Sequence, residues 1–197
     1  MKIFISCCLF IALTACASYK NQKNILSKVI EHNSIIFNNT NKKDVQKALI
    51  QVFLLAKDDT FTTITANEDS VAVQIQQNPY WILGFSRIVT KFNFHFTENK
   101  NDVLMTVEQQ TNSYINMFAF LSDYHGILET NSALNDLIIK RMNYLLGKSN
   151  VWYTCTDYKK LMNQQNINEN IDALCWFASD ISPQTSDGKK IIQNIKI

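Results

Sequence analysis

The sequence predicts an α+β fold in which an antiparallel four-stranded sheet, at approximately 60–110, is covered by helices near 42–57 and 131–146. In the two flanking segments apolar residues recur every three or four positions, which is the spacing of an amphipathic helix. Between them, apolar and polar residues alternate, as in strands with one buried face. Short polar connections between the strands favour antiparallel pairing.

The first predicted helix, 42–57, has clear signals at its start. The preceding residues Asn39, Thr40 and Asn41 all suit an N-cap, because their side chains can accept a hydrogen bond from a free backbone N–H. The apolar side chains that follow share one helix face: Val45, Ala48, Leu49, Val52, Phe53 and Ala56. The segment before the helix is ambiguous, since residues 25–30 suit a helix while residues 34–37 suit a strand.

Four segments have the alternation of strands, and two polar turns join them in pairs. The stretches TFTTITA and SVAVQIQQ flank the turn NEDS, and RIVTKFNFHF and VLMTVEQQ flank the turn ENKND. In the third strand the apolar face carries Phe92, Phe94 and Phe96, and the polar face carries Lys91, Asn93 and His95. One face of the sheet therefore needs to be covered by helices.

The second covering helix is expected near 131–146, where one face carries Leu134, Leu137, Ile138, Met142 and Leu145. Gly147 follows and is a typical helix terminator. We therefore expect an α+β domain over 25–148, with 149–197 as an appended C-terminal segment of the same domain.

The N-terminal segment 1–15 has the outline of a secretory signal peptide. Lys2 supplies a positive charge, an apolar run of 11 residues extends from Ile3 to Leu13, and two small residues follow. As a helix this run would be roughly 16 Å long, about half of the hydrocarbon core of a bilayer. It is therefore expected to be removed rather than to span a membrane.

The residues Leu13-Thr14-Ala15-Cys16 resemble the lipobox of bacterial lipoprotein precursors. The resemblance covers about the first sixteen residues and implies that Cys16 becomes the acylated first residue of the mature chain. Its acyl chains, palmitate among them, would anchor the protein in the membrane, with 16–24 as a lipidated tether. Position 17 is Ala rather than Asp, which by resemblance to enterobacterial lipoproteins favours the outer membrane over the inner membrane.

Cysteine usage fits an exported protein. Of 5 cysteines, Cys7 and Cys8 lie in the predicted signal peptide and Cys16 in the lipobox, which leaves Cys155 and Cys175. We expect these two to form a disulfide, which would contribute roughly 3 kcal/mol of stability. The alternative is two buried reduced thiols.

No motif points to catalysis, a metal or a cofactor. The 3 histidines are far apart, and the chain has no phosphate-binding loop, dinucleotide-binding motif, GxSxG or CxxC. A formal charge of +2 gives no reason to expect a nucleic-acid partner. A dispersed hydrolytic site remains as an alternative, and Ser122, Asp123 and His125 would be its residues.

Two apolar stretches, 79–85 and 114–124, are candidate recognition surfaces. The candidate partner surface consists of Tyr80, Trp81, Phe85, Phe118 and Phe120. The alternative is that both stretches complete the core or extend neighbouring strands.

Taken together, these features predict a lipid-anchored cell-envelope lipoprotein with a non-catalytic binding or scaffold role and an envelope protein as partner. The first alternative is a periplasmic carrier of a lipid or a small hydrophobic ligand, and the second is an envelope hydrolase.

Overall fold

The structure is a computed structural model, and it describes residues 34–56, 61–78, 80–81, 84–117, 120–124, 131–175 and 181–193. Residues Ile35–Ile197 form one compact unit. The predicted signal peptide, Cys16 and the tether lie outside the described residues. Within these ranges, no helix has the length and apolar character needed to cross a membrane.

In the described part of the chain, seven strands form one sheet. The order β1-β6-β5-β3-β2 accounts for five of them, and β4 and β7 pair with β5 and β6. Their bounds are β1 Ser34–Phe37, β2 Phe61–Ala66, β3 Ser70–Gln77, β4 Tyr80–Trp81, β5 Gly84–Asn99, β6 Asp102–Met117 and β7 Phe120–Tyr124. The predicted α+β class and antiparallel sheet are confirmed, whereas the predicted number of four strands is too low.

The additional strands follow from the length of the central hairpin. Strands β5 and β6 have 16 residues each, and their antiparallel register runs from Asn99↔Asp102 at the turn to Gly84↔Met117 at the far end. The hairpin therefore continues well beyond the alternating segments and into the two apolar stretches. There, β4 pairs with the start of β5 and β7 pairs with the end of β6. Residues 34–37 form a strand, as that part of the ambiguous segment suggests, while residues 25–30 lie outside the described residues.

Both predicted covering helices are present, with nearly the predicted bounds. Helix α2 comprises Lys42–Leu55, and Asn41 caps it by accepting a hydrogen bond from the backbone N–H of Asp44 at 2.8 Å. Helix α3 comprises Ser132–Leu145, and Asn131 caps it in the same way. In both cases a side-chain oxygen satisfies a backbone donor that has no partner inside the helix.

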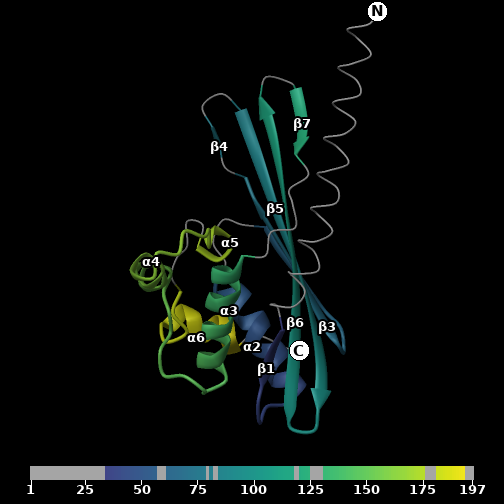
Figure 1. Cartoon of the computed structure of the whole chain (residues 1–197), viewed down its shortest axis with the longest axis vertical. Coiled ribbons are helices and arrows are strands. Elements are labelled where there is room, and N and C mark those ends of the chain that lie inside the picture. The colour runs from purple at the N-terminus through teal and green to yellow at the C-terminus, as the bar shows by residue number, and fades with distance from the viewer. Residues whose placement is uncertain are drawn as a thin grey trace, which may run out of the picture. The chain divides into compact units, whose positions relative to one another are not determined.

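The helices cover one face of the sheet, as Figure 1 shows for α2 and α3. Phe53 of α2 packs between Phe92 and Phe94 of β5, with ring-centroid distances of 5.4 and 5.8 Å. The apolar face expected from the alternation is buried, and Lys91, Asn93 and His95 on the opposite face are exposed. The alternation along β5 therefore predicts correctly which side of the sheet the helices cover.

The C-terminal segment adds three short helices: α4 Cys155–Gln164, α5 Asp172–Cys175 and α6 Ser186–Gln193. The predicted disulfide between Cys155 and Cys175 is present, with the two Cα atoms 5.7 Å apart. Side chains of this segment join the same core as the sheet, among them Tyr158, Met162, Ile171 and Leu174. Burial of this apolar surface and the disulfide together hold the segment in place.

Candidate functional site

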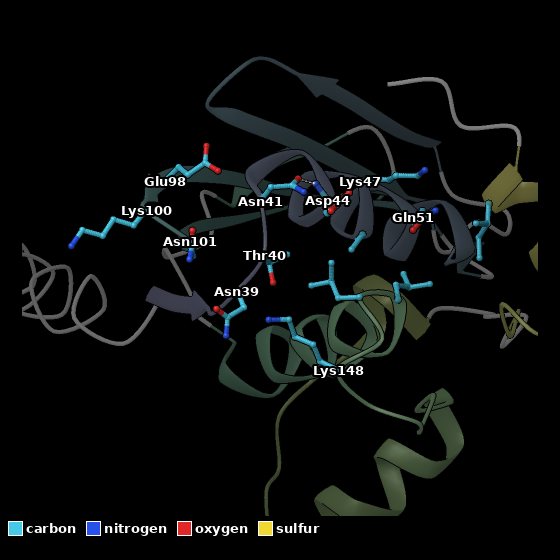
Figure 2. A pocket seen from close by; sticks show the side chains of 14 residues that line it. Asn39, Thr40, Asn41, Asp44, Lys47, Gln51, Glu98, Lys100, Asn101 and Lys148 are labelled. Atoms are coloured by element: carbon cyan, nitrogen blue, oxygen red, sulfur yellow. Dashed lines mark hydrogen bonds between the residues drawn. The ribbon is translucent and has the colours of Figure 1, made fainter.

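A surface hollow of about 790 Å³ lies between the start of α2, the β5–β6 turn, the end of α3 and α6 (Figure 2). This volume is in the range of small-ligand pockets, about 300–1,000 Å³. Its lining comes from residues 39–51, 98–101, 145–148 and Ile192, which are far apart in the sequence.

Backbone turns with left-handed residues shape the edge of the hollow. Asn39 has φ 52° and Lys100 has φ 57°, and Gly147, which directly precedes the lining residue Lys148, has φ 70°. Asparagine and glycine adopt this conformation readily, whereas a lysine does so at a cost. Lys100 is therefore held in an unfavourable backbone conformation at the tip of the central hairpin.

Hydrogen bonds join the loop before α2 to the other walls. The backbone N–H of Thr40 donates to the carbonyl oxygen of Asn101 at 3.0 Å. The N–H of Asn39 donates to Oδ1 of Asp102 at 3.1 Å, and the Lys148 ammonium group donates to the carbonyl oxygen of Asn38. The walls of the hollow are thus connected by hydrogen bonds that each involve the backbone of residues 38–40.

Helix α2 contributes Asp44, Lys47 and Gln51 along one side of the hollow (Figure 2). The Asp44 carboxylate already accepts a hydrogen bond from Nδ2 of Asn41 at 2.6 Å. In contrast, Gln51 makes no hydrogen bond through its side chain to any other residue in the described ranges, although only 5 % of its surface is exposed. The other polar residues with nearly complete burial in those ranges each have a partner, whereas the buried Nε1 of the half-buried Trp152 has none.

Charges around the hollow are mostly positive. Lys47, Lys100 and Lys148 line it together with Asp44 and Glu98. Within the described part of the chain, Lys47 and Lys100 form no ion pair. Two ammonium groups are thus available to a ligand.

The carboxylate of Glu98 also acts on a neighbouring cation, Lys42. The pKa of Lys42 is raised, first by its hydrogen bond to Asp69, against an opposing effect of burial, and then by the charges of Asp69, Glu68 and Glu98. Glu98 lines the hollow, but its negative charge also favours the charged form of Lys42, which does not line the hollow.

The floor of the hollow is apolar. Ala48 of α2 is buried, and Leu145, Leu146 and Ile192 are half-buried. An aliphatic part of a ligand would displace water from these side chains, while its polar part faced Gln51 and the lysines. The arrangement is thus suited to holding an amphipathic small molecule.

The described lining residues include no histidine or cysteine, and their one hydroxyl, that of Thr40, donates to the carbonyl oxygen of Asn38 at 3.0 Å. Among the residues that the structure describes, no group of three His, Cys, Asp or Glu is placed to hold a metal ion. The side chains that are present offer a ligand hydrogen bonds, charge and apolar contact.

The candidate partner surface lies at the opposite end of the central hairpin. Tyr80 of β4 pairs with Phe85 of β5, and Trp81 pairs with Gly84, which in turn pairs with Met117. Phe120 of β7 pairs with Met117, so the register brings these strands side by side. A strand of 16 residues is about 50 Å long, which separates this end of the sheet from the hollow.

Other predicted site residues are outside the described ranges. These are Cys16, Phe118 and His125, while Ser122 and Asp123, the other two residues of the dispersed hydrolytic site, belong to β7.

The residues of the hollow were not predicted as a site. Gln51 carried the one usable signal, because it follows Ala48 by three positions and so falls on the apolar face of the predicted helix. The sequence gives no such signal for the lysines, since most lysines on helices and in turns are exposed whether or not they bind a ligand.

Comparison of the chain with protein-family models, with curated proteins and with solved structures found no match in any of the three.

Proposed function

We propose that this chain is a lipid-anchored cell-envelope lipoprotein that acts by binding, and that the hollow is its ligand site. The lipobox resemblance at Cys16 supports the anchor, and Ala17 supports the outer membrane rather than the inner membrane. The observation that carries the binding site is the amide of Gln51, which lines the hollow and makes no hydrogen bond to another residue in the described ranges.

Most of the Gln51 side chain is buried, but its amide atoms are not among the fully buried polar atoms without a partner, so the amide faces the water in the hollow. A ligand that exchanges hydrogen bonds with this amide would replace that water. The amide is therefore a polar group that the hollow presents to a ligand on an otherwise apolar helix face.

The test is native mass spectrometry of the protein extracted gently from its own membranes. We expect a bound small molecule on the wild-type chain and none on the Gln51→Leu variant. Leucine is similar in size to glutamine and suits the apolar helix face, but it lacks the amide. The matched control is Gln46→Leu, because Gln46 is also buried in α2 but does not line the hollow. Identical spectra of wild type and Gln51→Leu would overturn the hollow as the site.

The anchor is tested separately by Cys16→Ser. This variant is expected to lose acyl labelling and membrane retention, because the side chain that would receive the lipid is missing. Continued membrane attachment of the variant would reject lipidation at this position.

A scaffold role is the second candidate, and the strand register at the far end of the hairpin favours it. Tyr80 of β4 and Phe85 of β5 are register partners there, Trp81 lies on the same strand as Tyr80, and Phe120 lies on β7, which pairs with β6. Cross-linking of the intact protein in its cells, followed by mass spectrometry, should capture a defined envelope protein. That capture should disappear in Trp81→Ala or Phe118→Ala, and its persistence would argue against this surface.

A further inference from the structure

The two sulfur atoms of the Cys155–Cys175 disulfide have different surroundings. Nη2 of Arg141, on α3, lies 3.4 Å from Sγ of Cys155 and is placed to donate a hydrogen bond to it. Within the described ranges, no other residue makes a hydrogen bond to Sγ of Cys175. The contact with Arg141 therefore distinguishes Cys155 from Cys175.

Arg141 is held beside the disulfide by two further contacts. Its Nε donates to the carbonyl oxygen of Tyr153 at 3.1 Å, and its guanidinium carbon lies 5.0 Å from the centroid of the Trp152 ring. Among the described residues it is the only charged residue that is buried, at 3 % exposure, so water screens its charge little. The positive charge therefore acts on the Cys155 sulfur from a fixed position.

The position of Cys155 in its helix favours negative charge as well. Cys155 is the first residue of α4, at the positive end of the helix dipole. Asp157 in the same turn opposes this effect, but its carboxylate accepts from the Thr154 hydroxyl at 2.7 Å and lies 3.8 Å from Nζ of Lys160. Cys175, in contrast, is the last residue of the short helix α5. A thiolate is therefore more favourable at Cys155 than at Cys175.

The other charged side chains of α3 and α4 near these residues are more exposed than Arg141. Lys159, one turn after Cys155, is exposed. Lys140 precedes Arg141 in the sequence, lies 3.5 Å from Asp136 and is half-exposed. Water screens both lysines, so Arg141 has the larger effect on the disulfide.

We propose that the Cys155–Cys175 disulfide is a thiol-modification site, at which an incoming thiol becomes bonded to Cys175 and Cys155 leaves as a thiolate beside Arg141. A disulfide sulfur is a weak hydrogen-bond acceptor, whereas a thiolate carries a full negative charge. The contact with Arg141 therefore becomes stronger as the bond opens, and the sulfur with the more stable thiolate leaves faster. This inference is independent of the hollow and its ligand.

The exchange is balanced in atoms and electrons. The incoming thiol loses its proton to water and attacks Sγ of Cys175 as a thiolate. A new S–S bond forms to Cys175 while the bond to Cys155 breaks, and the electron pair of the broken bond remains on Sγ of Cys155. A second thiol then attacks the first one in the mixed disulfide and releases Cys175, which takes up a proton. Two thiols are thereby oxidised to one disulfide, and the disulfide of the protein is reduced.

The test uses 2-mercaptoethanol, a small monothiol, because only 6 % of Cys155 and 8 % of Cys175 are exposed. The oxidised full chain is isolated as cells make it, treated briefly near neutral pH, trapped with N-ethylmaleimide and mapped by mass spectrometry. Because the two cysteines are about equally exposed, access favours neither. We expect mercaptoethanol on Cys175 and the maleimide on Cys155, in excess of the reverse arrangement by about threefold or more.

Titration of the single thiols tests the cause. In Cys175→Ser, the pKa of the remaining Cys155 thiol should be about 7.5 or lower, against an ordinary value of about 8.5, as followed by the ultraviolet absorbance of the thiolate. In Cys155→Ser, the pKa of the Cys175 thiol should not be lowered. Adding Arg141→Met to Cys175→Ser should raise the pKa of Cys155, and Arg141→Lys should raise it less, because a positive charge remains. Lys140→Met is the matched control on α3 and should have little effect.

Each result decides part of the proposal. Equal adducts on the two cysteines, an excess on Cys155 or no adduct at all would overturn the modification site. An ordinary pKa of Cys155 in Cys175→Ser would overturn its role as the leaving thiolate. A lowered pKa that responds to neither Arg141→Met nor Arg141→Lys would overturn the role of Arg141, and the Arg141→Lys variant decides this even if Arg141→Met does not fold.

Discussion

Gln46 and Gln51 lie on the same helix and are both buried, at 6 % and 5 % exposure. Among the described residues, only the side-chain amide of Gln46 makes hydrogen bonds to other residues. Nε2 of Gln46 donates to the carbonyl oxygens of Asn67 at 3.2 Å and Glu68 at 3.1 Å, which fastens α2 to the β2–β3 turn. Gln51 has no such bond among the described residues and lines the hollow instead. Gln46 thus joins two elements of the fold, and Gln51 is the amide on which the proposed ligand site depends.

This difference predicts opposite effects of one substitution. Gln46→Leu should lower the free energy of unfolding by about 1–2 kcal/mol, because the hydrogen bonds to the carbonyl oxygens of Asn67 and Glu68 are lost. Gln51→Leu should leave it unchanged or raise it slightly, since no protein hydrogen bond is lost. Urea denaturation of both variants in the absence of ligand measures this. Equal destabilisation would show that the Gln51 amide has a structural role.

Lys100 predicts a gain of stability on substitution. Because its backbone has φ 57°, replacing it with glycine should raise the free energy of unfolding by about 1 kcal/mol, which urea denaturation measures. Asn39→Gly is the control, because asparagine already tolerates its φ of 52° and little stability should be gained. A less stable Lys100→Gly protein would contradict the prediction.

Tyr158 predicts a loss of stability at alkaline pH. The pKa of Tyr158 is raised above its ordinary value of 10.0, first by burial, then by its hydrogen bond to Asp136, and then by the charges of Asp136 and Glu169. A raised pKa stabilises the folded protein fully below the ordinary pKa, and this contribution is lost as the pH rises above about 10. The free energy of unfolding of the wild type should therefore begin to fall as the pH rises through about 10 and continue to fall at higher pH.

The variant Tyr158→Phe isolates this effect. It loses the 2.7 Å hydrogen bond to Oδ2 of Asp136, which should cost about 1 kcal/mol at neutral pH. Above pH 10 its stability should decline less steeply than that of the wild type, because the buried group no longer ionises. Parallel pH profiles for the two proteins would reject the assignment to Tyr158.

The disulfide predicts a covalent link in the isolated protein. Peptide mapping without reductant should recover Cys155 and Cys175 in one linked pair, and the double variant Cys155→Ser, Cys175→Ser should unfold at lower denaturant concentration. With a sequence separation of 20 residues, the expected loss is about 3 kcal/mol. Recovery of both peptides alkylated and unlinked would contradict the bond.

The helices and the central part of the sheet were predictable because their residues repeat regularly. In α2, the spacing of Val45, Leu49, Val52 and Phe53 marks a helix face, and the capping asparagine stands where the helix begins. In β5, the alternation from Phe92 to Phe96 marks the face that packs on α2. Both patterns are local, and local patterns can be read without knowing the fold.

The far end of the hairpin and the hollow were not predictable in the same way. From Gln110 to Met117, strand β6 is largely polar and lacks alternation, so its pairing depends on register set at the Lys100–Asn101 turn. The hollow depends on several segments meeting in space. Sequence alone shows that Gln51 is an exception on an apolar face, but not that Lys100 and Ile192 lie near it.

The residues that line the hollow are far apart in the sequence, so ligand binding there would be coupled to folding of the whole domain. Its walls come from the first described helix, the hairpin turn, the end of α3 and Ile192, so no fragment that lacks any of these contains the complete site. A ligand that binds only the finished site stabilises the native state by mass action, by about 2.7 kcal/mol at a concentration one hundred times its dissociation constant. A chain with ligand in the hollow would then be one in which α6 is packed in its native position. The ligand concentration would in turn affect how long the chain resists proteolysis.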